Sequence, residues 1–337
     1  MTSFSHLART ALLGSALFVL TTQVIAAAEE ASSSLPALTQ KQIKDLQARA
    51  EKGDVDACFE LSGAYHVGDG VPKDDTLAFT WANKAARQGH AGAQHILGLF
   101  YNHGYGTAKD LSQSVYWLKK ATEHGDASAA ASLGFMFETG QGTPKDLAQA
   151  IHYYTLAAER GDGLAQSNLG RLYYQGEGVP VDYTRAFELF TLAADQGDAA
   201  AKSNLGRLYY HGNGVSVDYK RAFDLMTQAT QMDEADAFFP LGLMYEEGHG
   251  TPQDYTKAKE CYERAVAHED PMAMNNLGVL YMEGKGVTKD RAKAIALFEK
   301  AAALGCEEAK ENLENNKGWG LTRGRGILGM LLKVFKR

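Results

Sequence analysis

The fold is decided by residues 91–126, which read AGAQHILGLFYNHGYGTAKDLSQSVYWLKKATEHGD and form one copy of a unit that recurs every 36 residues. A leucine anchors each copy, and the series runs without an insertion through Leu61, Leu97, Leu133, Leu169, Leu205, Leu241 and Leu277. An aromatic residue follows each leucine by four positions, and a Gly-x-Gly pair and an aspartate come after it. A fixed period of this length predicts a protein built from stacked repeats.

Each repeat is predicted to be a hairpin of two helices. Ala93, Leu97 and Tyr101 are spaced by four positions and give the single apolar stripe of a first helix, called helix A. The glycine after the leucine, as in Gly98, has no side chain and lets a neighbouring helix approach closely. The Gly-x-Gly pair can adopt positive φ angles, so it is expected to end helix A and turn the chain.

The aspartate is expected to cap the second helix of each repeat, called helix B, at Asp74, Asp110, Asp146, Asp182, Asp218, Asp254 and Asp290. In the first repeat, the buried face of helix B is predicted to carry Ala78, Trp81, Ala85 and Ala86. A left-handed glycine is expected to end helix B, at Gly89, Gly125, Gly161, Gly197 and Gly305. The residue after three of these glycines is expected to cap the next helix A, at Asp126, Asp162 and Asp198.

Partial repeats flank the seven complete ones. Residues 39–52 match a helix B and residues 307–316 match a helix A, and both have the polar faces expected of caps on a repeat array. The predicted organisation is a signal peptide at 1–28, a linker at 29–38, a repeat domain at 39–316 and a tail at 317–337.

These motifs resemble the Sel-like repeats (SLR), relatives of the tetratricopeptide repeats, over about residues 39–316. The resemblance implies an all-α fold, a right-handed α/α superhelical solenoid of about seven 36-residue helix hairpins with a concave groove lined mainly by helices A. For exported bacterial members it also implies scaffolding, regulation of envelope signalling or host contact. A cysteine-rich branch linked to penicillin binding has a cysteine pair in each repeat, which this chain lacks, so that association is not carried over.

Residues 1–28 have the features of a Sec signal peptide. Arg9 gives a positive start, residues 11–20 are largely apolar, and Ala26, Ala27 and Ala28 are the small residues that a signal peptidase needs. A membrane-spanning helix needs roughly 20 apolar residues, so a retained anchor is the weaker alternative. Cleavage after Ala28 is expected to release a periplasmic or secreted protein.

Composition and motif searches argue against several other classes. The chain has a net charge of −7, which gives no sign of a nucleic-acid partner. No Ser-x-x-Lys or Gly-x-Ser-x-Gly motif occurs, and the ten histidines are scattered, so we predict no enzyme, no cofactor and no metal site. The three cysteines, Cys58, Cys261 and Cys306, are expected to be reduced and buried, because the repeat register places Cys261 and Cys306 beyond disulfide reach.

Candidate binding residues lie on helices A, where exposed positions vary between repeats. Repeats four and five share an identical segment, in which asparagine and arginine are three residues apart and project from one face. A polar row that grips a carboxylate or a main chain is therefore predicted from Asn168, Arg171, Tyr174, Asn204, Arg207 and Tyr210. The alternative is a recent duplication with solvated side chains. Phe238 and Phe239 in repeat six either extend the groove as an apolar contact or pack locally in the core.

The tail has six basic residues and no acidic one, and residues 325–337 have the pattern of an amphipathic helix. We expect it to contact an anionic membrane surface or a partner through Arg323, Arg325, Lys333, Phe335, Lys336 and Arg337. The equal alternative is that the tail folds back over the last repeat.

The sequence therefore predicts a non-enzymatic scaffold or regulator of the cell envelope that binds a polypeptide segment in its concave groove. The alternative is a cell-wall or polysaccharide-associated accessory protein. A β-lactam-interacting hydrolase is a remote third.

Overall fold

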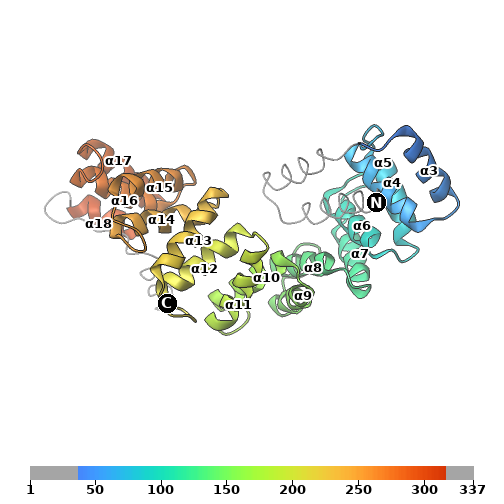
Figure 1. Cartoon of the computed structure of the whole chain (residues 1–337), viewed down its shortest axis with the longest axis horizontal. Helices are drawn as coiled ribbons and strands as arrows, with labels where there is room; N and C mark the ends of the chain where they lie inside the picture. Colours follow the sequence, from blue (N-terminus) through green and yellow to red (C-terminus); the bar gives the residue numbers. More distant parts are fainter. Residues whose placement is uncertain (1–36, 316–337) are drawn as a thin grey trace. The chain divides into compact units, whose positions relative to one another are not determined.

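The computed structural model describes residues 37–315, which form sixteen α-helices and no strand (Figure 1). Helices A are α4(Val55–Val67), α6(Ala91–His103), α8(Ala127–Thr139), α10(Gly163–Gln175), α12(Ala199–His211), α14(Ala235–Glu247), α16(Pro271–Glu283) and the terminal α18(Glu307–Asn315). Helices B are the initial α3(Gln40–Glu51), α5(Asp75–Ala86), α7(Leu111–Glu123), α9(Leu147–Glu159), α11(Tyr183–Asp195), α13(Tyr219–Gln231), α15(Tyr255–Ala267) and α17(Arg291–Ala303). The prediction of an all-α array of seven helix hairpins is confirmed.

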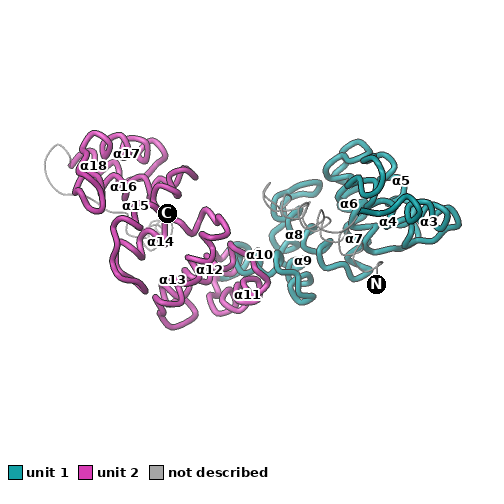
Figure 2. The backbone as a smooth tube through the Cα atoms, turned by 45° about the horizontal axis from the view of Figure 1, so that its top comes forward, with its two compact units in different colours: residues 1–172, 177–180 teal, residues 173–176, 181–337 magenta. Residues whose placement is uncertain are grey.

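The chain divides into two compact units, coloured separately in Figure 2. The described part of unit 1 comprises residues 37–172 and 177–180, and that of unit 2 comprises residues 173–176 and 181–315. Within each unit, helices that are neighbours in the chain pack against each other. The boundary between the units falls in α10 and the loop after it.

Capping aspartates begin both kinds of helix, as predicted. In all seven complete repeats the aspartate before helix B accepts a hydrogen bond from the main-chain N–H three residues later, at 2.9–3.1 Å. Asp126, Asp162 and Asp198 accept the same bond at the start of the next helix A. These caps satisfy main-chain donors that have no partner inside the helix.

Two kinds of glycine hold the array together by close approach. In helix A, a Cβ on Gly134 would lie 2.5 Å from Cδ1 of Tyr154 in the following helix B. The second glycine of the Gly-x-Gly pair makes a contact that the sequence did not predict, between repeats. A Cβ on Gly106 would lie 1.9 Å from the carbonyl oxygen of Asp75 at the start of the preceding helix B. The loop of each repeat therefore sits on the helix B before it.

The predicted buried face of helix B needs one correction. Ala78, Ala85 and Ala86 are buried, but Trp81 is only half-buried. The buried position is the next one, and its occupants in the seven repeats are Ala82, Leu118, Tyr154, Phe190, Met226, Tyr262 and Phe298. This position faces the glycine of helix A, so the packed face is turned by one residue from the predicted one.

Helix B ends with a positive φ in every complete repeat, but two of the seven lack glycine there. The five predicted glycines have φ between 87° and 94°. Repeats five and six instead have Asp233 at φ 61° and Glu269 at φ 62°. A side chain in this left-handed conformation costs about 1–2 kcal/mol.

The three cysteines have no disulfide partner, and Cys261 is half-buried whereas Cys58 and Cys306 are buried. The predicted signal peptide and most of the linker precede the described residues, and the basic tail follows them. No helix between residues 37 and 315 is long and apolar enough to cross a membrane.

Candidate functional site

Two identical eight-residue segments, 167–174 and 203–210, contain the predicted polar row. The structure divides the row between the two units: Asn168 and Arg171 lie in unit 1, and Tyr174, Asn204, Arg207 and Tyr210 lie in unit 2. Both asparagines are half-buried. Each arginine makes contacts inside its own unit, and the two sets of contacts differ.

Arg171 forms ion pairs with two acidic side chains of unit 1. Its Nη2 contacts Oε1 of Glu138 on α8, and its Nη1 lies 3.6 Å from Oε2 of Glu177. The hydroxyl of Tyr154 donates to the other oxygen of Glu138 at 2.7 Å. The guanidinium therefore links the helices A of repeats three and four.

Arg207 has a different partner because the helix opposite it contains a proline. Pro240 lies inside α14 and has no N–H to donate to the carbonyl of Asp236, four residues earlier. Nη2 of Arg207 donates to this carbonyl oxygen at 2.9 Å. A side chain from repeat five thus satisfies a main-chain acceptor that proline leaves open in repeat six.

Tyr210 joins a cluster with the Gly-x-Gly loop of repeat six. Its hydroxyl donates to Oε2 of Glu247 at 2.6 Å and lies 3.1 Å from Nδ1 of His249. The ring of His249 stacks on Tyr219 with centroids 4.2 Å apart. Burial, then the hydrogen bond to Glu247, raise the pKa of Tyr210, so the phenol stays protonated.

Tyr174, the equivalent of Tyr210 in repeat four, has no such acidic partner. Its hydroxyl is buried without a hydrogen-bond partner, and its ring packs edge-on against Tyr183 at 5.5 Å. Burial raises the pKa of this phenol. The two identical segments therefore place the same tyrosine in different surroundings.

Phe238 and Phe239 are buried, with exposed fractions of 5% and 6%, so they are not an exposed aromatic pair. Phe238 packs against His268 and lies under the guanidinium of Arg264, 4.9 Å from the ring centroid. Phe239 packs against Tyr262. Both rings therefore pack in the core, which was the second alternative for these residues.

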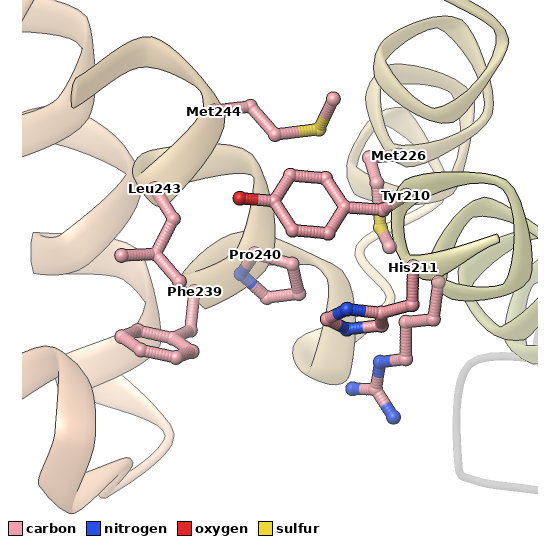
Figure 3. A pocket seen from close by; sticks show the side chains of 8 residues that line it. Tyr210, His211, Met226, Phe239, Pro240, Leu243 and Met244 are labelled. Carbon is pink, nitrogen blue, oxygen red and sulfur yellow. The ribbon is translucent and has the colours of Figure 1, made fainter. Parts of the chain in front are cut away.

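A small pocket lies between α12 and α14, the helices A of repeats five and six, and three predicted residues line it (Figure 3). Its volume is about 20 Å³, which is room for about one water molecule or methyl group. Figure 3 shows Tyr210 and His211 facing Pro240, with Leu243 and Met244 farther along α14. The full lining is Arg207, Tyr210, His211, Met226, Phe239, Pro240, Leu243 and Met244.

Most of the side chains that line this pocket are apolar, and Arg207, Tyr210 and His211 are its polar residues. Burial, with repulsion from Arg207, lowers the pKa of His211, which favours a neutral imidazole at pH 7. Burial raises the pKa of Glu234 and of Asp270, and the charge of Arg207 partly opposes both shifts. The apolar lining of the pocket can therefore accept an apolar side chain.

A buried chain of hydrogen bonds in unit 2 was missed by the sequence reasoning. Asn312 of α18 donates to Asn275 at 2.8 Å, Asn275 donates to Asn276 at 3.2 Å, and Asn276 donates to the Tyr262 hydroxyl at 3.4 Å. Tyr262 in turn donates to Glu246 of α14 at 2.7 Å. No signal in the sequence distinguished these residues, because Asn276 and Asn312 stand at the same repeat position as the half-buried Asn168 and Asn204.

Within residues 37–315, no group of three histidine, cysteine, aspartate or glutamate side chains is placed to hold a metal ion. The acidic residues that recur in each repeat are helix caps, as described above.

Comparison with known proteins shows the same repeat. A model of the Sel1 repeat matches seven consecutive segments, 55–90, 91–126, 127–162, 163–198, 199–234, 239–270 and 271–306. A protective antigen of uropathogenic Escherichia coli with an SLR fold is 31% identical with a TM-score of 0.70, over 84% of this chain and 61% of that chain. This chain thus spans less than two thirds of the antigen's length. A Sel1 repeat protein from Oxalobacter formigenes is 30% identical with a TM-score of 0.59, over 92% and 86% of the two chains.

Proposed function

Because the chain belongs to the Sel1 repeat family, whose members generally act as protein-interaction scaffolds, we propose that it is a non-enzymatic scaffold or regulator of the cell envelope. Its role is to bind a polypeptide segment on the surface formed by neighbouring helices A. The observation that carries this proposal is the pocket between α12 and α14, because three residues predicted to contact a partner line it.

The pocket suits one small apolar side chain of a bound segment. Its volume admits a methyl group, its lining is mostly apolar, and Arg207, Tyr210 and His211 are the polar residues that border it. An anchor of this kind, bordered by polar groups, is typical of the centre of a protein interface. The main chain of the segment would supply the partners for these polar residues.

Site-specific photo-crosslinking tests this proposal. A photoreactive amino acid is placed at His211, and the matched control has it at Leu192, which is 50% exposed on the helix B α11. We expect a defined partner to crosslink in envelope extract at position 211 and not at position 192. Identical crosslinked proteins at both positions, or none at 211, would contradict the proposal.

We also propose that the protein acts outside the cytoplasm, on the basis of the signal-like features of residues 1–28. A fusion of these residues to alkaline phosphatase is expected to be active, and the mature protein is expected to begin at Glu29. An inactive fusion and an uncleaved N-terminus would contradict export.

For the tail, we propose contact with an anionic surface, because its basic residues and its amphipathic pattern suit a headgroup layer. Co-sedimentation with anionic liposomes is expected to be lost on removal of residues 318–337. Unchanged co-sedimentation would leave the membrane role without support.

A further inference from the structure

Repeat seven has a shallow polar hollow that the proposed function does not use. Its volume is about 600 Å³, and it lies where the loop 286–290 leads into the N-terminus of α17. The side chains that give it its charge are Lys259, Lys289, Asp290, Arg291 and Lys293, and Tyr281 contributes to the wall.

Four of these side chains are cations, of which Lys259 already pairs with Glu263 at 3.3 Å, and the single acid among them is engaged as a helix cap. The Asp290 carboxylate accepts the N–H of Lys293 at 2.9 Å as the cap of α17. Nζ of Lys293 donates to the Tyr281 hydroxyl at 2.6 Å and lies 4.2 Å from the centroid of the same ring. This hydrogen bond is the main cause of a raised Lys293 pKa, so the ammonium stays charged in a fixed place.

The other six repeats serve as internal controls for this charge. The positions one before, one after and three after the capping aspartate are all basic in repeat seven. In each of the other repeats, only one of these three positions is basic. The residue after the cap is elsewhere Leu or Tyr in five repeats and Asp in one. The basic cluster is therefore a departure from the repeat that hairpin geometry does not require.

The position of Arg291 in the array explains why it is exposed. In earlier repeats the Gly-x-Gly loop of the next repeat packs against the residue that follows the capping aspartate. For example, a Cβ on Gly250 would lie 2.1 Å from the carbonyl oxygen of Tyr219. Repeat seven is followed by α18 alone within the described residues. Within the described residues no such loop packs against the main chain at Arg291, and its side chain is exposed.

We propose that this hollow binds the carboxylates of an acidic polypeptide segment. Its volume exceeds that of a single oxyanion, and its cations are spread over α15, the loop and α17, so several carboxylates can be neutralised together. Lysine acts as a point charge that accepts varied geometry, which suits flexible glutamate and aspartate side chains. The proposal goes beyond the proposed function, because it adds a second binding surface and names the chemistry of the segment that occupies it.

Fluorescence anisotropy of a labelled hexaglutamate peptide with the full chain tests the proposal. The variant K289Q/R291Q/K293Q removes three charges from the hollow. The control K73Q/K109Q/K145Q removes three charges from the residue before the capping aspartate in repeats one to three. We expect at least tenfold weaker binding for the first variant and less than a twofold change for the control, with affinity falling as salt rises. Both variants are compared with the wild type by circular dichroism.

Three results would overturn the proposal. One is equal affinity for the wild type and the repeat-seven variant, and another is an equal loss in both variants, which indicates diffuse attraction. The third is displacement of the peptide by inorganic phosphate or anionic vesicles at a lower concentration than by unlabelled peptide, which assigns the hollow to those ligands. Crosslinking at position 211 is read separately, so failure there contradicts the proposed function whatever the peptide does.

Discussion

The guanidinium of Arg207 donates from Nη2 to the carbonyl oxygen of Asp236 at 2.9 Å, across the boundary between repeats five and six. This carbonyl lacks its helical donor because Pro240 stands four residues later. The same arginine lines the pocket between α12 and α14. One side chain therefore repairs the helix of its neighbour and helps to shape the candidate binding surface.

The contribution of Arg207 to stability is expected to depend on Pro240. Arg207→Ala should lower the free energy of unfolding by about 1–1.5 kcal/mol, because the solvent-exposed carbonyl of Asp236 loses its charged donor. In a Pro240→Ala background the alanine N–H can serve Asp236, so the loss should shrink by about 1 kcal/mol. Urea unfolding of the four proteins measures this coupling. Arg171→Ala, with and without Pro240→Ala, is the control, and additive effects at Arg207 would contradict the relationship.

Repeat six should become more stable when its left-handed residue is replaced by glycine. Glu269 has φ 62° at the end of α15, where five other repeats have glycine. Glu269→Gly is expected to raise the free energy of unfolding by about 1 kcal/mol. The reverse change, Gly125→Glu, should lower it by a similar amount, since a Cβ there meets no atom within 4 Å. Chemical denaturation decides, and a loss of stability in Glu269→Gly would refute the argument.

Because neighbouring repeats approach closely at Gly106, its replacement should cost more stability than replacement of Gly125. Gly106 and Gly125 both have positive φ, so a change to alanine costs each a similar conformational penalty. A Cβ on Gly106 would also collide with the carbonyl oxygen of Asp75, whereas one on Gly125 has open space. We expect Gly106→Ala to cost about 1–3 kcal/mol more than Gly125→Ala. Thermal unfolding of the pair checks this, and equal losses would show that the loop contact is not needed.

Two capping aspartates should give the free energy of unfolding pH dependences of opposite sign. Burial raises the pKa of Asp270, so its favourable contribution is present in acid and is lost as the pH rises through that pKa. Hydrogen bonds from the Ala57 N–H and from Arg49 lower the pKa of Asp54, so its contribution is lost as the pH falls. Asparagine keeps both caps without the charge.

From about pH 4 to pH 7, the stability of Asp270→Asn relative to the wild type should therefore rise, and from about pH 2.5 to pH 4.5 that of Asp54→Asn should fall. Urea unfolding at the two ends of each pH range measures the two differences. The same sign for both variants would contradict these assignments.

Local signals were sufficient for the helix boundaries, because a cap or a turn depends on residues within a few positions. The capping role of Asp110 and the turn at Gly104 follow from the sequence for this reason. The partners of Arg171 and Arg207 depend instead on the neighbouring repeats. The preceding helix A carries Glu138 for Arg171 but Tyr174 for Arg207. The following helix A carries Asn204 for Arg171 but Pro240 for Arg207. The identical segments therefore make different contacts.

The repeat pattern also did not predict which side chains point into the core. Trp81 and Ala82 are adjacent, and only the approach of a helix A glycine decides which position is fully buried. The burial of Phe238 and Phe239 likewise depends on residues of repeat seven and of helix B, which a one-dimensional pattern does not bring together. The basic hollow was missed for a different reason: Lys289, Arg291 and Lys293 are close together in the sequence, but Lys259 of the preceding helix B joins them only in the folded chain.

The buried hydrogen bonds that run from Asn312 through Asn275, Asn276 and Tyr262 to Glu246 bear on how unit 2 unfolds. In a repeat array each repeat contacts only its neighbours, so the ends are expected to fray one repeat at a time. This chain of bonds couples α18 to α14, beyond nearest-neighbour range. Loss of α18 removes the first hydrogen bond of a series whose other members reach Glu246 in repeat six. The C-terminal end should therefore open as one cooperative block, with similar amide exchange rates in α14, α16 and α18.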